Sequence, residues 1–423
     1  MAARSPRRYI VEWFLALAAL ACGSAPALAQ TQADFFDDSA LQEVRLAISD
    51  RDWQALKTHF QDNTYYTADL TWRGITIRNV GIRSRGGGTR SGTKPGLRFD
   101  INRYVASQEF LGLKAFDLKN MDTDASLLRE SVAMKIYARM GLAAPREAHT
   151  RFYVNNQYAG VYVIVEEIDR TFLSHAFGPL EAQVEHGGYL FEYKWAFPYD
   201  FQYLGSDLKA YAPLFEPQTR DTDAIVDLYG PIESMIRTIN ESTDDDFAAA
   251  VNKYLDLPLF MKYLAVELFT VEWDGFTGNW ETNNFYLYRF EQTGRSQLIP
   301  KDRDHAFIWD GVDAADFIDA PITLRLDTNV LARRATAVPE LFQLFLDALN
   351  GIVGLAETTA PGDPRGWLER EIDRQARQIA PAVAEDPVFP FSVDDFQAEV
   401  NFLLRFARAR PSVVACQVAQ NCP

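Results

Sequence analysis

Alternation of apolar and polar side chains between residues 64 and 101 limits the folds open to this chain more than any other feature. The segment TYYTADLTWRGITIRNVGIRSRG has the pattern of two or three strands with one face buried. A basic loop, RSRGGGTRSGTKPG, interrupts the alternation with three consecutive glycines, and LRFDI resumes it. These residues predict a β-rich N-terminal part that carries a flexible glycine-rich loop.

Two helices and a hairpin are expected around these strands. Helical spacing of apolar residues predicts one helix over residues 41–60. Apolar side chains four residues apart, from Leu128 to Met140, predict a second helix, which Gly141 ends. The segment RFYVNNQYAGVYVIVEEID predicts a hairpin that turns at Asn155-Asn156. The second helix is therefore expected to be embedded among strands.

Residues 1–29 have the composition of a secretory signal peptide. Basic residues precede an apolar run from Trp13 to Cys22, and a small-residue cleavage pattern ends at Ala29. The run is too short to span a membrane, and no later window approaches about 20 apolar residues, so we expect a secreted or periplasmic bacterial protein. Arg7-Arg8 before YIV also allows a twin-arginine signal, whereas lipoprotein anchoring at Cys22 lacks a leucine at the usual place.

The charge of the chain indicates which partners to expect, and its cysteines indicate a disulfide. The chain has 58 acidic and 42 basic residues and a formal net charge of −16, so nucleic acid is not an expected partner. With Cys22 in the leader, Cys416 and Cys422 remain as a pair spaced for a small disulfide loop in an exported protein. We expect a monomer without a transmembrane segment.

Beyond about His175 the sequence changes to loops and helices. The exceptions are NNFYLYRF and SQLIP, which predict a hairpin closed by a Thr-Gly turn. We therefore expect a β-rich N-terminal lobe over residues 30–175 and a larger, mainly helical C-terminal lobe over 176–423. This α+β order of elements predicts a two-lobed protein-kinase-like fold.

Two aspartates follow the strand pattern in SQLIPKDRDHAF. Side chains two residues apart on a strand share a face, so Asp302 and Asp304 are expected on one side and Lys301 and Arg303 on the other. Two neighbouring carboxylates repel, and solvent, a basic neighbour or a bound cation must offset that repulsion. From this segment alone, a solvated turn in which Lys301 and Arg303 partner the acids remains open.

The rest of the chain supplies the groups that phosphoryl transfer needs, namely donors for phosphates, carboxylates for magnesium and an acid at the attacking hydroxyl. Asp274 lies in a loop after a predicted helix, and Asn284 opens the strand that leads to Asp302 and Asp304. Magnesium takes only one or two protein carboxylates together with water and phosphate oxygens, which suits so sparse a site. The basic residues on or around the glycine-rich loop are Arg83, Arg85, Lys94 and Arg98.

Six segments in order resemble the CotH-like kinase family, which is named for a spore-coat protein kinase and related to atypical protein kinases. Their order and spacing, rather than any single segment, make the resemblance specific, and they run from about Val80 to Val414. The segments are IRSRGGG with KPGLRF, FLGLKAFDLKNMDTDASLLRESVAMKIYARMG, FYVNNQYAGVYVIVEEIDRTFL, WDGFTGNWETNNFYLY, IPKDRDHAF and FLLRFARARPSVV.

The resemblance implies a role for each candidate residue. Asp274 would be the catalytic acid/base, and Asn284 with Asp302 and Asp304 would hold Mg²⁺ or Mn²⁺. Glu130 in the embedded helix would pair with a basic residue. The residues expected to contact ATP or its phosphates are Arg83, Arg85, Lys94, Arg98 and Glu166.

These roles imply an exported kinase that transfers the γ-phosphoryl group of ATP to Ser or Thr hydroxyls of a protein. Family members usually read Trp-Asp-hydrophobic-Asp where this chain reads Lys301-Asp302-Arg303-Asp304, and the two cations would lower magnesium affinity or bind an acidic substrate. Two other functions remain open: nucleotidyl or another transfer on the same scaffold, and a non-catalytic module that binds a partner at a surface.

Overall fold

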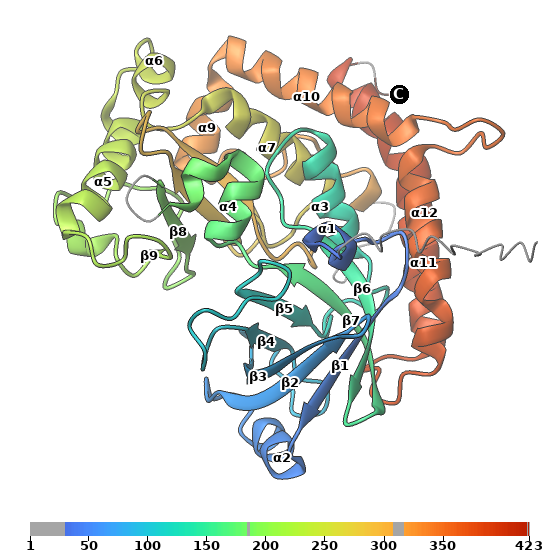
Figure 1. The fold of residues 1–423 in the computed structure, drawn as a ribbon. Coiled ribbons are helices and arrows are strands. Elements are labelled where there is room, and N and C mark those ends of the chain that lie inside the picture. The colour runs from blue at the N-terminus through green and yellow to red at the C-terminus, as the bar shows by residue number, and fades with distance from the viewer. Residues whose placement is uncertain (1–29, 184–186, 308–316, 421, 423) are drawn as a thin grey trace, which may run out of the picture.

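The computed structural model describes residues 30–183, 187–307, 317–420 and 422 of the chain, so the predicted signal peptide lies outside it and remains a prediction. Seven strands form a closed barrel in the order β1-β2-β3-β4-β5-β7-β6 (Figure 1). They are β1 (Gln42–Ile48), β2 (Tyr66–Trp72), β3 (Ile75–Ser84), β4 (Leu97–Asp100), β5 (Ala115–Lys119), β6 (Glu147–Val154) and β7 (Gln157–Glu166).

Strand β1 closes the barrel. It pairs antiparallel with β2 and parallel with β6, where Val44 lies opposite Phe152. Its side chains alternate between buried and more exposed, and Val44, Leu46 and Ile48 enter the barrel core. The prediction of one helix over residues 41–60 is therefore wrong in its first half, where the period of two indicates a strand, and right for α2 (Asp50–Thr58).

A second, antiparallel sheet lies outside the barrel, in the order β11-β10-β8-β9. The predicted hairpin supplies β10 and β11, with Phe285 opposite Pro300, and β8 and β9 extend the sheet from residues that had no strand prediction. These strands are β8 (Tyr189–Tyr193), β9 (Phe215–Pro217), β10 (Phe285–Arg289) and β11 (Ser296–Pro300).

The predicted two-lobed protein-kinase-like fold is contradicted by this architecture. The β-rich part is a closed barrel, because β1 joins β2 to β6, and the second part contains a four-stranded sheet in addition to helices. The proposed boundary between residues 30–175 and 176–423 is not tested by the structure and remains a prediction.

Helices cover the second sheet and one side of the barrel. Figure 1 shows α11 and α12 running side by side along the barrel, and α11 packs on β7 while α10 crosses α7 and α12. The helices are α1 (Gln32–Phe35), α2, α3 (Arg129–Arg139), α4 (Arg170–Phe177), α5 (Ile225–Glu241), α6 (Phe247–Val251), α7 (Leu257–Thr270), α9 (Val330–Ala337), α10 (Pro339–Glu357), α11 (Trp367–Ala384) and α12 (Val393–Val418), with 3-10 turns at η1 (Pro179–Ala182) and η2 (Leu208–Ala210).

Several local predictions are confirmed. The embedded helix is α3, and Gly141 follows it with a φ of 76°. The β6–β7 hairpin turns at Asn155 and Asn156, both in the left-handed region with φ of 49° and 64°. Cys416 and Cys422 form a disulfide at the end of α12.

No helix in the described ranges is by itself long and apolar enough to cross a membrane. The pair α9 and α10 meets the length and composition test only when taken together, and a bend of 100° separates the two helices.

Candidate active site

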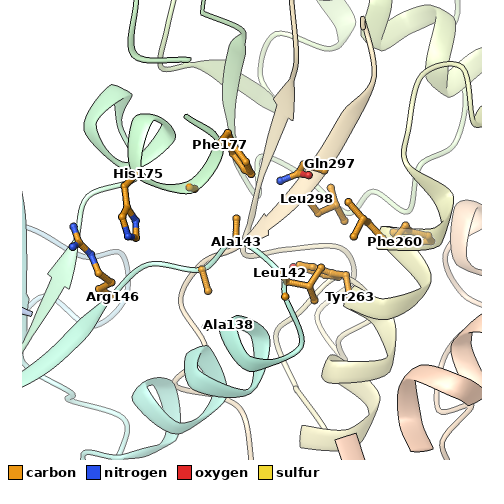
Figure 2. A pocket seen from close by; sticks show the side chains of 14 residues that line it. Ala138, Leu142, Ala143, Arg146, His175, Phe177, Phe260, Tyr263, Gln297 and Leu298 are labelled. Atoms are coloured by element: carbon orange, nitrogen blue, oxygen red, sulfur yellow. The ribbon is translucent and has the colours of Figure 1, made fainter. Parts of the chain in front are cut away.

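An apolar cavity of about 460 Å³ lies between the end of α3, α4, α7 and β11 (Figure 2). Its polar side chains include Arg146, His175 and Gln297, and Figure 2 shows Arg146 and His175 at one side of it. None of the predicted site residues lines this cavity. Glu166 is connected to it indirectly, because Arg146 binds both carboxylate oxygens of Glu166, at 2.9 and 2.5 Å.

Several of the predicted residues lie together elsewhere, near a lysine that the sequence did not single out. Lys119, the last residue of β5, donates to both carboxylate oxygens of Glu130, at 2.6 and 2.5 Å, and also to the carboxylate of Asp302. Glu130 lies in the first turn of α3, and its expected pairing with a basic residue is present. Lys119 therefore joins the barrel, the embedded helix and the loop after β11.

The charges of this triad depend on one another. Burial lowers the pKa of Lys119, but Asp302 and Glu130 outweigh that effect and raise it above its usual value. Burial, opposed by Lys119, raises the pKa of Glu130 to about 7. Burial also acts against ionisation of Asp302, yet Lys119 holds the pKa of that carboxyl well below its usual range. Asp302 is therefore an anion fixed against a cation at neutral pH.

The second aspartate of the pair lies in the same region. The hydroxyl of Thr123 donates to Asp304 at 2.9 Å. Burial first, and the neighbouring Asp302 second, raise the pKa of Asp304. The two carboxylates thus interact, as their spacing predicted, and Asp302 adopts a left-handed backbone conformation with a φ of 53°.

Asp274 follows α7 and is held by the two asparagines that precede β10. Asn283 donates to its Oδ1 at 3.0 Å and Asn284 to its Oδ2 at 2.8 Å. Burial raises the pKa of Asp274, and the hydrogen bond from Asn283 opposes that rise. Asp302 and Asp304 raise this pKa further, so the three carboxylates share one electrostatic environment.

Backbone hydrogen bonds fix the two loops that carry these side chains. Lys301 N donates to Asn284 O at 3.1 Å, Trp273 N to His305 O at 3.2 Å, and Phe307 N to Thr270 O at 2.9 Å. The loop after β11 therefore lies directly against the loop after α7, which brings Asp274 and Asn284 to the aspartate pair.

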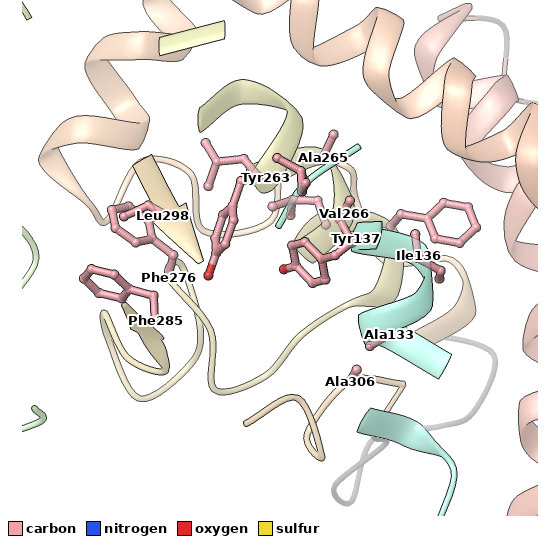
Figure 3. Close-up of a cluster of buried hydrophobic side chains, with 14 of the residues drawn as sticks. Ala133, Ile136, Tyr137, Tyr263, Ala265, Val266, Phe276, Phe285, Leu298 and Ala306 are labelled. Atoms are coloured by element: carbon pink, nitrogen blue, oxygen red, sulfur yellow. The ribbon is translucent and has the colours of Figure 1, made fainter. Parts of the chain in front are cut away.

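Lys301 and Arg303, which alternate with the two aspartates, pair with other carboxylates. Arg303 is completely buried, binds Glu267 at 2.8 Å, and has its guanidinium 5.6 Å from the ring centres of both Tyr137 and Tyr263. Figure 3 shows these two tyrosines inside the core formed by α3 and α7. Lys301 binds Glu192. Strand β11 ends at Pro300 and Asp302 has a positive φ, so the strand alternation expected for KDRD does not continue through these residues. The two cations nevertheless form their ion pairs with Glu192 and Glu267, and not with Asp302 or Asp304.

Residues 82–414 match the family model described as CotH kinase protein. The chain belongs to this family. Inner spore coat protein H of Bacillus subtilis (strain 168) is 23% identical over 354 residues, which are 81% of this chain and 84% of the relative. Invasin CotH3 and Invasin CotH7 of Rhizopus delemar are 24% and 22% identical over 58% and 52% of this chain. The chain spans only 41% and 35% of those two relatives.

In this CotH-family chain, two of the predicted basic residues lie close to the site. Arg85 binds Asp117 at 2.8 Å. Burial lowers the pKa of Arg85, but Asp117 and then Asp302 outweigh that effect and raise it above its usual value. Arg98 binds Glu167 at 2.5 Å. Asp117 and Lys119 are two residues apart on β5, so these cations belong to the barrel face that carries Lys119.

The other two basic residues have partners within the protein. Arg83 donates to Tyr65 at 3.2 Å and to Asn63 at 3.3 Å. Lys94, only 1% exposed, donates to Asp386 at 2.9 Å. Their expected contacts with phosphates are not tested by this geometry and remain predictions.

The donor set fits a magnesium ion that is also held by a substrate. Asp302 and Asp304 supply carboxylate oxygens, and Asn284 commits its amide nitrogen to Asp274, which leaves its carbonyl oxygen to bind a cation. Residues 30–183, 187–307, 317–420 and 422 contain no group of three or more His, Cys, Asp or Glu that could hold an ion by themselves. Phosphate oxygens or waters would have to complete the coordination.

Sequence reasoning missed Lys119 and Thr123. The signal for Lys119 was present, because a lysine at the end of the apolar strand FDLK is an unusual buried residue and Glu130 follows it by 11 positions. Thr123 lies in a loop and carries no comparable signal.

Proposed function

We propose that this chain is an exported ATP-dependent protein kinase that transfers the γ-phosphoryl group to Ser or Thr hydroxyls. The observation that carries the proposal is the position of Lys119 between Glu130 and Asp302. A lysine paired with a helix glutamate, next to an aspartate suited to magnesium, is the arrangement that protein kinases use to place ATP phosphates. The family description, CotH kinase protein, supports the same reaction.

In this mechanism Asp274 lies at the attacking hydroxyl. Its carboxylate accepts the hydroxyl proton as the oxygen–phosphorus bond forms, and ADP leaves with the electrons of the broken phosphoanhydride bond. Asn283 and Asn284 orient the Asp274 carboxylate through its two oxygens. Burial favours the protonated form of this acid, which assists acceptance of the proton late in the transfer.

Asp302, Asp304 and Asn284 are the proposed ligands of Mg²⁺ or Mn²⁺. When bound, the ion would neutralise charge on the transferred phosphates. Lys119 and Arg85 are the cations that we propose as phosphate contacts, and each would exchange part of its present pairing, with Asp302 and Asp117 respectively. Lys301 and Arg303 form their ion pairs with Glu192 and Glu267, although the charge of Lys301 also helps to lower the pKa of Asp302.

The remaining proposed nucleotide contacts need a change of partner. Arg83, Lys94 and Glu166 are bound to Tyr65, Asp386 and Arg146, so a phosphate or adenine contact requires those bonds to be exchanged. Arg98 is bound to Glu167, and this ion pair would also have to be exchanged.

We also propose that the mature chain acts outside the cytoplasm. The leader over residues 1–29 has the composition of a signal peptide, and the similar proteins carry the names spore coat protein and invasin, which refer to exterior structures. Its protein substrate would therefore be exported or exposed at a surface.

The test is incubation of residues 30–423 with ATP and Mg²⁺ or Mn²⁺, followed by intact-mass measurement. We expect phosphate to be added to the wild type and to neither Asp274→Ala nor Asp302→Ala. Addition of adenylate instead would identify a nucleotidyl transferase on this site.

A binding measurement separates an inactive module from an enzyme that lacks its substrate. A nucleotide at a hundredfold excess over Kd raises the free energy of unfolding by about 2.7 kcal/mol. If the wild type showed no mass gain and no nucleotide-dependent stabilisation, the kinase proposal would be overturned in favour of a non-catalytic module.

A further inference from the structure

A second cavity, of about 540 Å³, lies at the N-terminal half of α11, apart from the candidate active site. Five arginines line it together with two carboxylates, Glu371 and Asp373, and two further carboxylates, Asp363 and Asp38, bind Arg365 and Arg374. The five arginines therefore exceed these four carboxylates by one, in a chain whose net charge is −16. The five arginines, which we call the arginine cluster, are Arg139, Arg365, Arg370, Arg374 and Arg377.

Helical geometry explains why these side chains meet. Arg370, Arg374 and Arg377 are separated by four and three residues on α11 and therefore share one face. Arg139 comes from the last turn of α3, and its guanidinium lies 4.4 Å from the ring centre of Trp367. Arg365 immediately precedes the helix, whose N-cap, Gly366, forms no side-chain cap hydrogen bond.

The cluster contains both fixed and unpaired cations. Arg365 and Arg377 both bind Asp373, at 2.7 and 2.8 Å, which fixes their orientation. In contrast, Arg139 and Arg370 have no carboxylate partner in the described ranges, and Arg370 donates only to the backbone oxygen of Arg365. Two guanidinium groups are thus available beside others that are already held in place.

Guanidinium groups bind phosphate oxygens in pairs, and a phosphorylated side chain brings a charge of about −2 to so compact a site. The positive charge is local, so extended polyanions such as nucleic acid or an anionic membrane would meet repulsion from the acidic remainder of the molecule. We propose that the arginine cluster is a docking site for a phosphorylated serine or threonine side chain of a polypeptide.

This site is mechanically connected to the helix that carries Glu130. The hydroxyl of Ser131 on α3 donates to Gln375 on α11 at 2.7 Å, and Gln375 donates to Glu371 at 2.8 Å. Glu371 also accepts from Lys135 of α3 at 2.5 Å. A docked phosphopeptide therefore binds the unit formed by α3 and α11. The docking site stands on these contacts and does not require that the chain itself be a kinase.

The test measures binding to nucleotide-free chain, residues 30–423, by fluorescence anisotropy. The probe is a fluorescein-labelled glycine–serine heptapeptide with one phosphoserine, compared with the same peptide without phosphate. We expect binding of the phosphorylated form only, weakened about tenfold by Arg370→Gln and further by the added Arg139→Gln. Arg370→Lys keeps the charge but loses the paired donors, so it should recover little of the affinity.

The control is Arg405→Gln, because Arg405 is exposed on α12, lies 5.8 Å from the ring of Phe402, and is outside the cluster. It should bind the phosphopeptide like the wild type, and unchanged thermal unfolding of each variant would show that the fold is retained. Equal binding of the unphosphorylated peptide, or of the phosphopeptide by the Arg139/Arg370 variant, would overturn the proposal. If inorganic phosphate displaced the peptide at a concentration equal to the peptide's own Kd, the site would bind simple anions and would not recognise a phosphopeptide. If the chain bound only phosphatidylglycerol vesicles, the partner would be a membrane surface.

Discussion

At the scale of single residues, Lys119 connects more parts of the candidate site than any side chain singled out from the sequence. It pairs with both Glu130 and Asp302, although these acids lie 11 and 183 positions away. The KDRD motif pointed to a repulsion between Asp302 and Asp304 that needed an offsetting charge. The structure identifies Lys119 as that charge.

Lys119→Met should reduce phosphoryl transfer by on the order of 10²-fold or more, because it removes a charged donor directed at the phosphates. It also leaves the buried carboxylate of Glu130 unpaired, so the free energy of unfolding should fall by about 3–5 kcal/mol. Phosphate incorporation and urea unfolding measure the two effects. Lys114→Met, at an exposed lysine just before β5, should change neither, and equal behaviour of the two variants would contradict the role of Lys119.

Glu147 on β6 gives a pH dependence. Both of its carboxylate oxygens are buried without a hydrogen-bond partner, and burial, followed by the charge of Glu130, raises its pKa well above 4.5. Because the folded-state pKa exceeds the unfolded value, protonated Glu147 favours the fold, and this contribution is lost as the pH rises through the folded value.

We therefore expect stability to decrease more steeply in the wild type than in Glu147→Gln over the pH range above 4.5. Urea midpoints across that range provide the measurement. Parallel pH profiles for the two proteins would mean that Glu147 is already ionised in the folded state.

At the scale of elements, the connection between α11 and α12 fastens the glycine-rich loop to the barrel. Lys94 of that loop binds Asp386, whose carboxylate also accepts the backbone N–H of Val161 at 2.9 Å. Asn120, next to Lys119, donates to the backbone oxygens of Thr89 and Lys94 at 3.1 and 2.8 Å. The loop is thus held on one side by the C-terminal helices and on the other by the strand of the active site.

Asp386→Ala should lower the free energy of unfolding by about 3–5 kcal/mol, because it leaves the amine of Lys94 buried without its partner. It should also expose residues 86–96 to trypsin, which cuts after Arg and Lys. The adjacent Glu385→Ala, which removes the more exposed pair with Arg151, should cost at most about 1 kcal/mol. Protection of the loop in both variants would show that Asp386 does not hold it.

Elements with a local signature were predictable, and those defined by distant partners were not. Asn155 and Asn156 tolerate the positive φ of a tight hairpin turn, so their pair marked the β6–β7 hairpin. The alternation of Val44, Leu46 and Ile48 was hidden within a longer segment read as helical. Strands β8 and β9 are short, and their pairing with each other and with β10 decides their conformation.

At the scale of the whole molecule, the predicted fold class was wrong because one strand pairing could not be foreseen from the sequence. Closure of the barrel depends on β1 lying parallel to β6, with Val44 opposite Phe152, and nothing local to either strand specifies that partner. The candidate site is assembled in the same way. Lys119 and Arg85 come from the barrel, whereas Asp274, Asp302 and Asp304 come from loops in the second part. Motif order located most of the candidate residues, but only the fold shows which of them interact.

Arg410 of α12 links the C-terminal helix to the start of the active-site loop. It is completely buried and donates to the backbone oxygens of Leu268 and Phe269 at 2.7 and 3.1 Å, in the last turn of α7. It also donates to Ile318 and Ala320 at 2.8 and 2.6 Å. Four carbonyl groups without intrahelical partners or strand partners are therefore satisfied by one side chain.

Arg410→Gln should lower the free energy of unfolding by about 3 kcal/mol or more, since several buried carbonyls lose their donor together. Because α7 ends just before Asp274, phosphoryl transfer should fall while nucleotide-dependent stabilisation persists. Arg405→Gln, five positions earlier, changes an exposed arginine of the same helix and should leave both properties near those of the wild type. If urea unfolding and kinetics gave the same values for the two variants, α12 would act as a cover for the core and would not position the catalytic loop.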